Sequence, residues 1–408
     1  MPRTNTSRLW FLLTTIAIDS IGLGIIIPVL PDVIRRFITD EAAVSRMYGY
    51  FIATYALMQF ISSPLLGSLS DRVGRRPVLL LSLLGAAIDY FFMAFAGTLP
   101  LLFLGRVIAG VSGASYTVAS AYVADISDDS NRSKNFGVVG AGFGIGFIAG
   151  PAIGGVLAQF GPQYPFIAAG CFNLANCLFG FFVLPESLPH EARESARRTT
   201  FNLNPFQSLA KILRIPFIRP LIVVAVLMSL AGQTHPSIWT LYTQHRYGWS
   251  VQQVGISLAV VGLLQALSQG LLTGVIVKRF GERKVFLFGL FGEIVSYCGF
   301  AFAPNVFTLY FTLLFSSIFW AAQPALQSLI SREVSSQEQG ELQGTLMGLG
   351  SLMAILNPLI VTALFAATSN PAGHLYLPGS PYLFASLLFA IAMAISLPWS
   401  ARSQKLRH

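Results

Sequence analysis

Long apolar runs, each about twenty residues, follow one another along almost all of this chain. A helix of that length can cross the roughly 30 Å hydrocarbon core of a bilayer. The runs must be helical, because lipid offers no partner to backbone groups and a helix satisfies them internally. The sequence therefore predicts an all-α membrane protein with twelve transmembrane helices. The runs are residues 9–30, 48–68, 78–97, 100–123, 135–157, 163–184, 219–243, 252–277, 285–303, 306–330, 341–366 and 380–399.

The low content of charge agrees with a surface that lies mostly in lipid. Charged residues make up 11% and hydrophobic residues 54% of the 408 residues, whereas a soluble globular domain carries roughly 25% charged residues. All loops but one are short, so a separate soluble domain has no room to fold. We therefore expect a protein that is not an enzyme.

The distribution of basic residues predicts the orientation of the chain. An even number of spans places both termini on one side of the membrane. The loops and tails of that side hold all but five of the 26 Lys and Arg. Cytoplasmic loops are enriched in these residues, so both termini are expected in the cytoplasm. The net charge of +9 is then a topology signal, and we expect no nucleic-acid partner.

A short polar motif occurs twice, once in each half of the chain. The sequence GSLSDRVGRRP at Gly67–Pro77 is matched by GVIVKRFGERK at Gly274–Lys284, 207 residues later. Half-chain repeats across many spans are an architecture of transporters. We expect two pseudo-symmetric six-helix bundles, at residues 1–184 and 219–408, joined by a cytoplasmic linker at 185–218. The same offset relates Arg72 to Arg279, Gly74 to Gly281, Arg76 to Arg283, Gly137 to Gly344 and Pro151 to Pro358.

The first copy of the motif concentrates charge at the membrane surface. Its glycines allow a tight turn and close helix contact. Asp71 is expected where a helix ends, able to accept hydrogen bonds from a neighbouring helix N-terminus. The arginines can pair with acids such as Asp125 or Asp128. Such a cluster would act as a gate; the alternative is plain topological anchoring by the arginines. The gating candidates are Gly67, Asp71, Arg72, Gly74, Arg75 and Arg76.

The fifth run, GAGFGIGFIAGPAIGG at Gly140–Gly155, predicts a close-packed helix face. Seven glycines and one proline in 16 residues would weaken an ordinary helix. Glycines every four residues line one face and make a groove for a neighbouring helix, and the proline adds a kink. A role in transport direction and simple packing are both open. The candidates are Gly146, Gly150, Pro151 and Gly154.

Four charged residues, Asp19, Asp89, Arg106 and Glu293, fall well inside apolar runs. A charge at the bilayer centre costs at least about 2.5 kcal/mol, so each is a functional candidate. Burial disfavours a charged carboxylate, which suits an acid that takes a proton on one side and releases it on the other. We therefore expect these four to couple protons. The alternative is a structural ion pair, favoured for Asp19 with Arg106.

Uncharged polar and aromatic residues within the runs are candidates for substrate contact. Amides beside aromatic rings suit a broad, weakly charged organic molecule. Hydrogen bonding between helices is the alternative for each amide. The candidates are Gln59, Gln233, Trp239, Gln265, Gln323 and Asn357.

These motifs resemble a known family. Two six-helix halves with GSLSDRVGRRP after the second span resemble the major facilitator superfamily, and the glycine run resembles the antiporter signature of its drug exporters. The likeness to the tetracycline/proton antiporters covers nearly the whole chain. It is carried by DSIGLGIIIPVLP at Asp19–Pro31, RRPVLLLSLLGAAIDY at Arg75–Tyr90, WTLYTQHRYGW at Trp239–Trp249 and PALQ at Pro324–Gln327.

The resemblance implies that Asp19, Asp89 and Glu293 take part in drug and proton handling, and it also matches Arg106 and Asp71. One departure concerns the eighth span. Members of the family carry a His within GLLH, where this chain has GLLQ with Gln265. Gln cannot titrate, so coupling would depend on the acids alone. The acid of the ninth span is also Glu where the family usually has Asp.

The function implied is a proton-coupled antiporter of the bacterial inner membrane that exports drug-like compounds, tetracyclines among them, by alternating access. An exporter of an endogenous metabolite or siderophore remains open, and a proton symporter is disfavoured by the glycine signature. No cofactor is expected besides the proton gradient, although a tetracycline could travel as a metal chelate. The expected partners are a small-molecule substrate, protons and membrane lipid, with the chain acting as a monomer.

Overall fold

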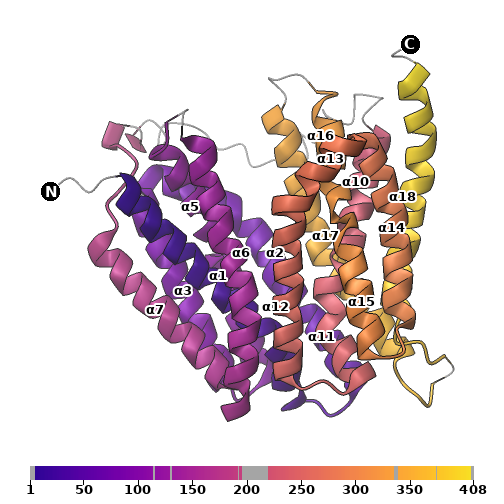
Figure 1. Cartoon of the computed structure of the whole chain (residues 1–408). Helices are drawn as coiled ribbons and strands as arrows, with labels where there is room; N and C mark the ends of the chain where they lie inside the picture. The colour runs from indigo at the N-terminus through magenta and orange to yellow at the C-terminus, as the bar shows by residue number, and fades with distance from the viewer. Residues whose placement is uncertain are drawn as a thin grey trace. The chain divides into compact units, whose positions relative to one another are not determined.

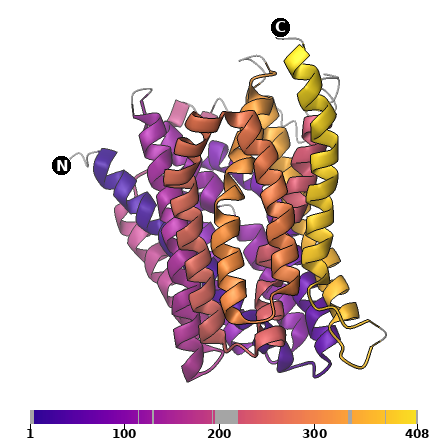
Figure 2. The same cartoon turned by 45° about the vertical axis from the view of Figure 1, so that its right-hand side comes forward.

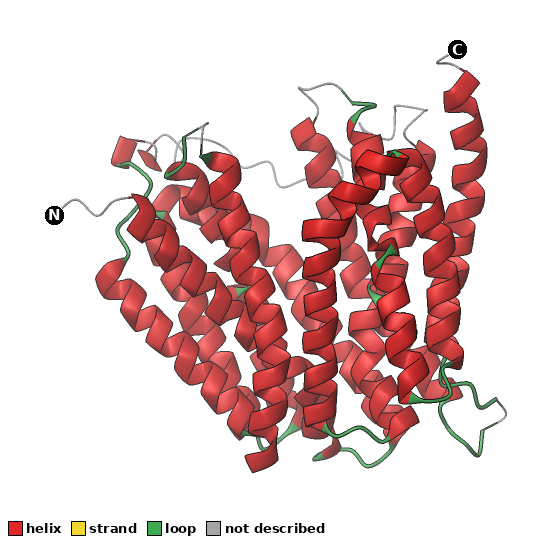
Figure 3. Ribbon diagram, viewed as in Figure 1, coloured by secondary structure: helices red, strands yellow, loops and turns green. Residues whose placement is uncertain are grey.

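Helices account for all the regular structure in the part of the chain that the computed structural model describes. That part comprises residues 5–113, 115–128, 131–191, 193–194, 219–334, 339–373 and 375–405. It contains no strand (Figure 3). Twelve helical segments within it are long and apolar enough to cross a membrane. The predicted all-α fold with twelve spans is confirmed.

Each span overlaps one predicted run, and most extend beyond it. The largest difference is the second span, predicted at 48–68 and observed at Glu41–Val73. Its ends carry polar and charged residues, which hydropathy alone assigns to loops although the helix continues through them. Among the described residues, five spans are built from consecutive helical pieces instead of one uniform helix: Leu99–Asp125, Asn135–Phe160, Arg219–Tyr247, Val251–Phe280 and Val306–Ser331.

The chain divides into two compact units, each with a short segment from the other half of the sequence. The first unit comprises Met1–Thr39, Thr54–Leu203 and Trp249–Gly262, and the second comprises Asp40–Ala53, Asn204–Gly248 and Leu263–His408. The predicted division into 1–184, 185–218 and 219–408 stays a prediction. Most of the predicted linker, residues 192 and 195–218, lies outside the described residues.

In the first half, most of the packing between helices involves α1 or α3. The helices of this half are α1 (Asn5–Arg35), α2 (Glu41–Val73), α3 (Arg75–Phe95), α4 (Leu99–Ser112), α5 (Ser115–Asp125), α6 (Arg132–Leu157) and α7 (Tyr164–Val183), with a 3-10 turn at Ala158–Phe160. Helix α1 packs along α6 and α7 (Figure 1). Helix α3 packs against α7 and α4. The α3–α4 contact brings two of the predicted proton-coupling residues together.

The helices of the second half pack around α14 and α10. They are α10 (Arg219–Gly232), α11 (Thr234–Tyr247), α12 (Val251–Leu267), a π-helical turn (Ser268–Leu272), α13 (Thr273–Phe280), α14 (Glu282–Phe302), α15 (Val306–Ser317), a 3-10 turn (Phe319–Ala321), α16 (Ala322–Ser331), α17 (Gln339–Thr368) and α18 (Ser380–Lys405). Helix α18, yellow in Figure 2, packs against α14 and α10, and α17 packs against α10 and α11.

The glycine face predicted on the fifth span is confirmed, and its neighbour is α1. A Cβ atom added at Gly146, Gly150 or Gly154 would lie 2.6–2.7 Å from a backbone carbonyl oxygen of α1. Real Cβ atoms are not found so close to backbone, so only glycine permits this approach of the two helices. The carbonyl groups belong to Ala17, Ile21 and Ile25, which also recur every four residues.

Two prolines related by the repeat make matching contacts, one in each unit. In the first unit a Cβ on Gly255 would collide with the carbonyl oxygen of Pro151. In the second unit a Cβ on Gly49 would lie 2.8 Å from the carbonyl oxygen of Pro358. The segments that carry these glycines, 40–53 and 249–262, are the ones each unit receives from the other half of the sequence.

Candidate functional site

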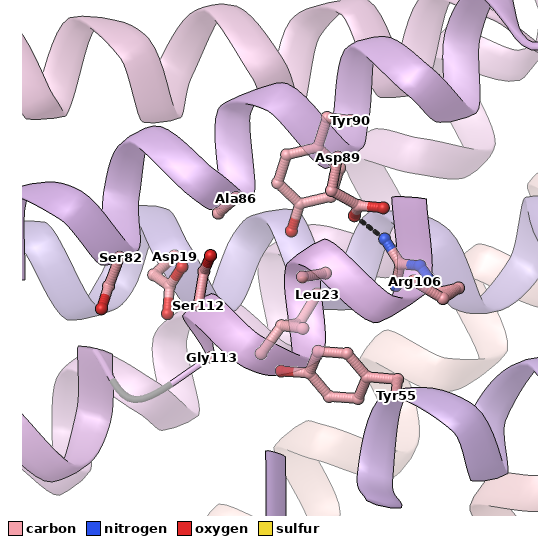
Figure 4. A pocket seen from close by; sticks show the side chains of 11 residues that line it. Asp19, Leu23, Tyr55, Ser82, Ala86, Asp89, Tyr90, Arg106, Ser112 and Gly113 are labelled. Carbon is pink, nitrogen blue, oxygen red and sulfur yellow. Dashed lines mark ion pairs between the residues drawn. The ribbon is translucent and has the colours of Figure 1, made fainter. Parts of the chain in front are cut away.

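A buried ion pair between α3 and α4 is the centre of the first candidate site. Arg106 Nη2 contacts Asp89 Oδ2 (Figure 4). The two residues are only 4% and 1% exposed. The ion pair that the structure shows for Arg106 is therefore with Asp89, where the sequence favoured Asp19. Adjacent helices α3 and α4 bring Asp89 and Arg106 together, a pairing that depends on helix rotation and not on sequence spacing.

A small cavity lies beside this ion pair. Its volume of about 20 Å³ suits about one water molecule, whereas sites for drug-sized ligands measure roughly 300–1,000 Å³. The cavity can therefore serve water and proton transfer, but in this conformation it cannot hold a whole drug. The polar side chains that line it are Asp19, Tyr55, Ser82, Asp89, Tyr90, Arg106 and Ser112.

Asp19 lies on the same cavity, contributed by α1. It is half-buried, and Figure 4 shows it set apart from the Asp89–Arg106 pair. The structure thus brings all three predicted coupling residues of the first half to one place. Two carboxylates and one guanidinium share a water-sized space, so a proton taken up by either acid changes the charge that Arg106 must balance.

The aromatic ring that supports Arg106 was not predicted from the sequence. The Arg106 guanidinium lies over the ring of Tyr55, 5.6 Å from its centroid. Gln59 holds that tyrosine: its Nε2 donates to the Tyr55 hydroxyl at 3.3 Å and to the Gly113 carbonyl at 2.9 Å. The predicted substrate candidate Gln59 therefore joins helices. The i, i+4 spacing of Tyr55 and Gln59 is the signal that could have linked them.

The acid of the second half occupies a separate buried position. Glu293, on α14, is 5% exposed and accepts a hydrogen bond from Ser316 Oγ at 3.5 Å. The next residue, Ser317, accepts a 2.7 Å hydrogen bond from Ser268 through its carbonyl oxygen. Ser268 begins the π-helical turn, and Ser317 ends α15 just before a 3-10 turn. Such turns inside helices are frequent at functional sites.

The repeated motif places a charge cluster at one end of the first unit. Gly74 has φ of 114°, which favours glycine, and it separates α2 from α3. Arg75 Nη1 lies 2.6 Å from Asp71 Oδ1, and Arg75 Nε lies 3.2 Å from Asp125 Oδ2. The predicted pairing of the motif with Asp125 is confirmed. Asp71 thus neutralises an arginine on the next helix.

The carboxylate at the start of α3 is that of Glu186, a residue of the predicted linker. Its Oε1 accepts the Arg75 backbone N–H at 2.8 Å and its Oε2 accepts that of Arg76 at 3.2 Å. An anion is stabilised at a helix N-terminus by these free N–H groups. At α3 this role, expected of Asp71, is therefore filled by Glu186. Nothing local in the sequence distinguishes Glu186 from its acidic neighbours.

The second unit contains an ion pair that corresponds to Arg75–Asp125 of the first unit, with the charges reversed. Arg332 Nη2 lies 2.6 Å from Glu282 Oε1. The 207-residue offset maps Arg75 onto Glu282 and Asp125 onto Arg332. The repeat has therefore kept an ion pair between matching helices while exchanging its signs.

The other substrate candidates divide into buried and accessible residues. Asn357 is fully buried, and its Nδ2 donates to the Leu230 carbonyl at 2.7 Å and to Thr234 Oγ1 at 2.9 Å. Trp239 is also fully buried, with its ring centroid 4.3 Å from that of His235 and the two rings tilted by 35°. Both positions suit helix packing. The accessible candidates are Gln265, exposed on α12 before the π-helical turn, Gln233, half-buried between α10 and α11, and Gln323, which lines a chamber described below.

Comparison with known proteins identifies the family. The sequence profile of the Major Facilitator Superfamily matches residues 12–269 and 221–407. The chain is 40% identical to the tetracycline resistance protein, class C, of Escherichia coli over 366 residues, covering 90% of this chain and 91% of that protein. It is 44% identical to the class E protein of Escherichia coli over 282 residues, 69% of each chain. The chain belongs to the major facilitator superfamily, in its tetracycline-efflux branch.

The fold agrees with this assignment. The crystal structure of a bacterial homologue of the human lysosomal transporter Spinster, inward-facing and unoccupied, matches with a TM-score of 0.79 over 98% of both chains, at 16% identity. Proteins of this superfamily are transporters of small molecules. The chain is accordingly a multi-pass membrane protein of a transporter family.

Proposed function

We propose that this protein is a proton-coupled antiporter of the bacterial inner membrane that exports drug-like organic compounds, tetracyclines among them, by alternating access. The observation that carries the proposal is the buried Asp89–Arg106 pair on a water-sized cavity shared with Asp19. The Asp89 carboxylate is buried beside its counter-charge, and the adjacent space is large enough for a water molecule that could exchange a proton with it. The relatedness to tetracycline resistance proteins supports a drug as the exported substrate.

The proposed coupling follows from charge balance. With Asp89 ionised, Arg106 is neutralised directly. When Asp89 takes up a proton the pair loses its attraction, and Asp19 becomes the acid in the cavity that can balance Arg106. Each charge moved across 100 mV gains about 2.3 kcal/mol. Exchange of one proton for an uncharged drug would therefore use the membrane potential directly, and exchange for a monocation would use only the pH gradient.

The test is proton-driven uptake of a drug panel into inverted membrane vesicles. The wild-type protein is expected to accumulate tetracycline when a proton gradient, inside acid, is imposed. The Asp89→Asn variant keeps the size of the side chain but cannot take up or lose a proton, so drug uptake driven by the gradient should fall to the background of empty vesicles. Retained proton-driven uptake in that variant would refute Asp89 as the coupling acid.

The same assay separates the alternatives. Uptake into inverted vesicles corresponds to export from the cell, so transport in the opposite direction would indicate a symporter. Accumulation of an endogenous metabolite in cells lacking the protein, with no change in drug susceptibility, would indicate a metabolite or siderophore exporter.

A further inference from the structure

A chamber in the second unit lies between α10, α16 and α17 and plays no part in the proton site. Its volume is about 250 Å³. Helices α16 and α17 each present one face to it, with residues spaced i, i+3, i+4 and i+7 along the helix. The side chains that matter here are Gln323 and Gln327 on α16, Gln343 and Met347 on α17, and Met228 and Ser229 on α10.

The lining is polar without being charged. Among the described residues, those that line the chamber include three glutamines and one serine but no acid or base. Gln323 and Gln327 are exposed in the structure although they belong to the membrane span Val306–Ser331. An amide facing hydrocarbon would lose its hydrogen bonds. These side chains must therefore face water or a polar ligand within the protein.

Two of the amides are already oriented toward each other. Gln327 Nε2 donates to Gln343 Oε1 at 2.8 Å. A carboxamide has two donor hydrogens and an oxygen with two lone pairs. The pair therefore keeps at least one free donor on each residue and acceptor capacity on Gln327, held in fixed positions. Such a pair can bind a carbonyl and an adjacent hydroxyl or amide on one edge of a ligand.

The size and remaining lining define which part of a ligand fits. The volume falls below the roughly 300–1,000 Å³ of sites that enclose a whole drug-sized molecule. The chamber thus suits one end of such a molecule. The methionines beside the amides are flexible and polarisable, and they can adapt to rings of different shape.

From these observations we propose that Gln323, Gln327 and Gln343 form a substrate subsite for the neutral, hydrogen-bonding edge of the exported drug. The inference rests on the proposed export function and adds a substrate class to it. The subsite selects molecules that carry carbonyl, enol or amide groups over purely apolar organic cations. Charge is handled elsewhere, by the buried acids and Arg106.

Selectivity in transport tests the subsite. The double variant Gln327→Leu/Gln343→Leu removes both amides at similar side-chain volume. In inverted vesicles its KM for tetracycline should rise about tenfold, because two hydrogen bonds to the drug are lost. Its KM for tetraphenylphosphonium, a cation without hydrogen-bonding groups, should stay unchanged. The matched control is Gln253→Leu, an exposed glutamine at the start of α12 that hydrogen-bonds only locally with Ser250, which should leave both values unchanged.

Occupancy is tested by protection of an introduced thiol, which requires no transport. With Cys171, Cys177 and Cys298 replaced by serine, the Met347→Cys and Gly344→Cys variants are treated with a maleimide in the presence and absence of tetracycline. Met347 lines the chamber and is 69% exposed. Gly344 lies on the same helix outside it, and a Cβ there has open space within 4 Å. Tetracycline should slow labelling of Met347→Cys at least fivefold and leave Gly344→Cys unaffected.

The outcomes distinguish the subsite from the transport function. A wild-type protein that moves neither compound contradicts drug export itself. Wild-type transport of tetracycline with an unchanged KM in the double variant overturns the subsite alone. So does an equal rise in KM for both compounds, which would show a general structural effect, or protection of both thiols or of neither.

Discussion

At the scale of single residues, Arg106 is a buried guanidinium whose charge requires a partner. It is 4% exposed, paired with Asp89 and stacked over Tyr55. The free-energy cost of removing the two opposite charges from water is offset by their mutual attraction. Removing one partner leaves the other charge buried and uncompensated, which destabilises a protein by about 3–5 kcal/mol. The pair therefore makes the two residues interdependent for stability as well as for coupling.

A double-variant cycle tests this interdependence. Arg106→Gln alone is expected to lower stability by about 3–5 kcal/mol, because the Asp89 carboxylate loses its counter-charge. Adding Asp89→Asn replaces the pair by two neutral amides and should recover more than half of that loss, although transport stays abolished. Thermal unfolding of the purified protein in detergent measures both. A double variant that is no more stable than Arg106→Gln would contradict the ion-pair account.

At the scale of the helix, the α1–α6 contact explains the unusual composition of the fifth span. Its glycines at every fourth position let α6 approach the backbone of α1. Close backbone approach in lipid is stabilised by van der Waals packing, since lipid provides no hydrophobic drive for helix association. The glycines lower the intrinsic helix propensity of α6, and the packing of α6 against α1 compensates for this loss. The glycine motif thus allows α1 and α6 to pack closely, and any role in transport direction would be additional to this packing.

Two alanine substitutions on this helix should behave in opposite ways. A Cβ at Gly150 would lie 2.6 Å from the Ile21 carbonyl oxygen, while a Cβ at Gly144 meets nothing within 4 Å. Gly150→Ala should destabilise by about 1–3 kcal/mol through overpacking. Gly144→Ala should be neutral or stabilise by up to about 1 kcal/mol, since alanine is the better helix former. The measurement is thermal unfolding of both proteins; equal effects would show that the glycine face is not the reason.

For the whole molecule, the 207-residue repeat organises both units. It relates Pro151 to Pro358, each of which contacts a glycine from a segment of the other half of the sequence. It also relates the Arg75–Asp125 ion pair to the reversed Glu282–Arg332 pair. A repeat can therefore conserve the geometry of a contact while the chemical roles of the two copies diverge.

The orientation of the whole chain is open to a direct test. Twelve spans and the bias of Lys and Arg predict both termini in the cytoplasm. Green fluorescent protein fused to either terminus should fluoresce, and alkaline phosphatase fused to either should be inactive, because it folds only in the periplasm. Phosphatase fusions after Leu375, in the loop before α18, should be active. An active phosphatase at either terminus would contradict the predicted topology.

Properties that depend on local sequence were predictable. The spans follow from hydropathy, because crossing the bilayer is a requirement on about twenty consecutive residues. The glycine face follows from helical periodicity. The four intramembrane charges stand out because each is costly in lipid. The pairing of the arginine motif with Asp125 was predictable because the motif follows the second span and Asp125 ends the fourth, which places both on the same side of the membrane.

The partners of these residues depended on the tertiary structure. Which of the two acids, Asp19 or Asp89, forms the ion pair with Arg106 did not follow from the sequence, because their helices can be rotated about their axes without changing the hydropathy pattern. The Glu186 cap on α3 joins residues 111 positions apart, and the glutamine pair on α16 and α17 depends on which faces those helices present to each other. The sequence by itself determined which groups must avoid lipid, since that is a property of each residue in its span. Which groups meet once they are buried was decided only by the packing of the helices.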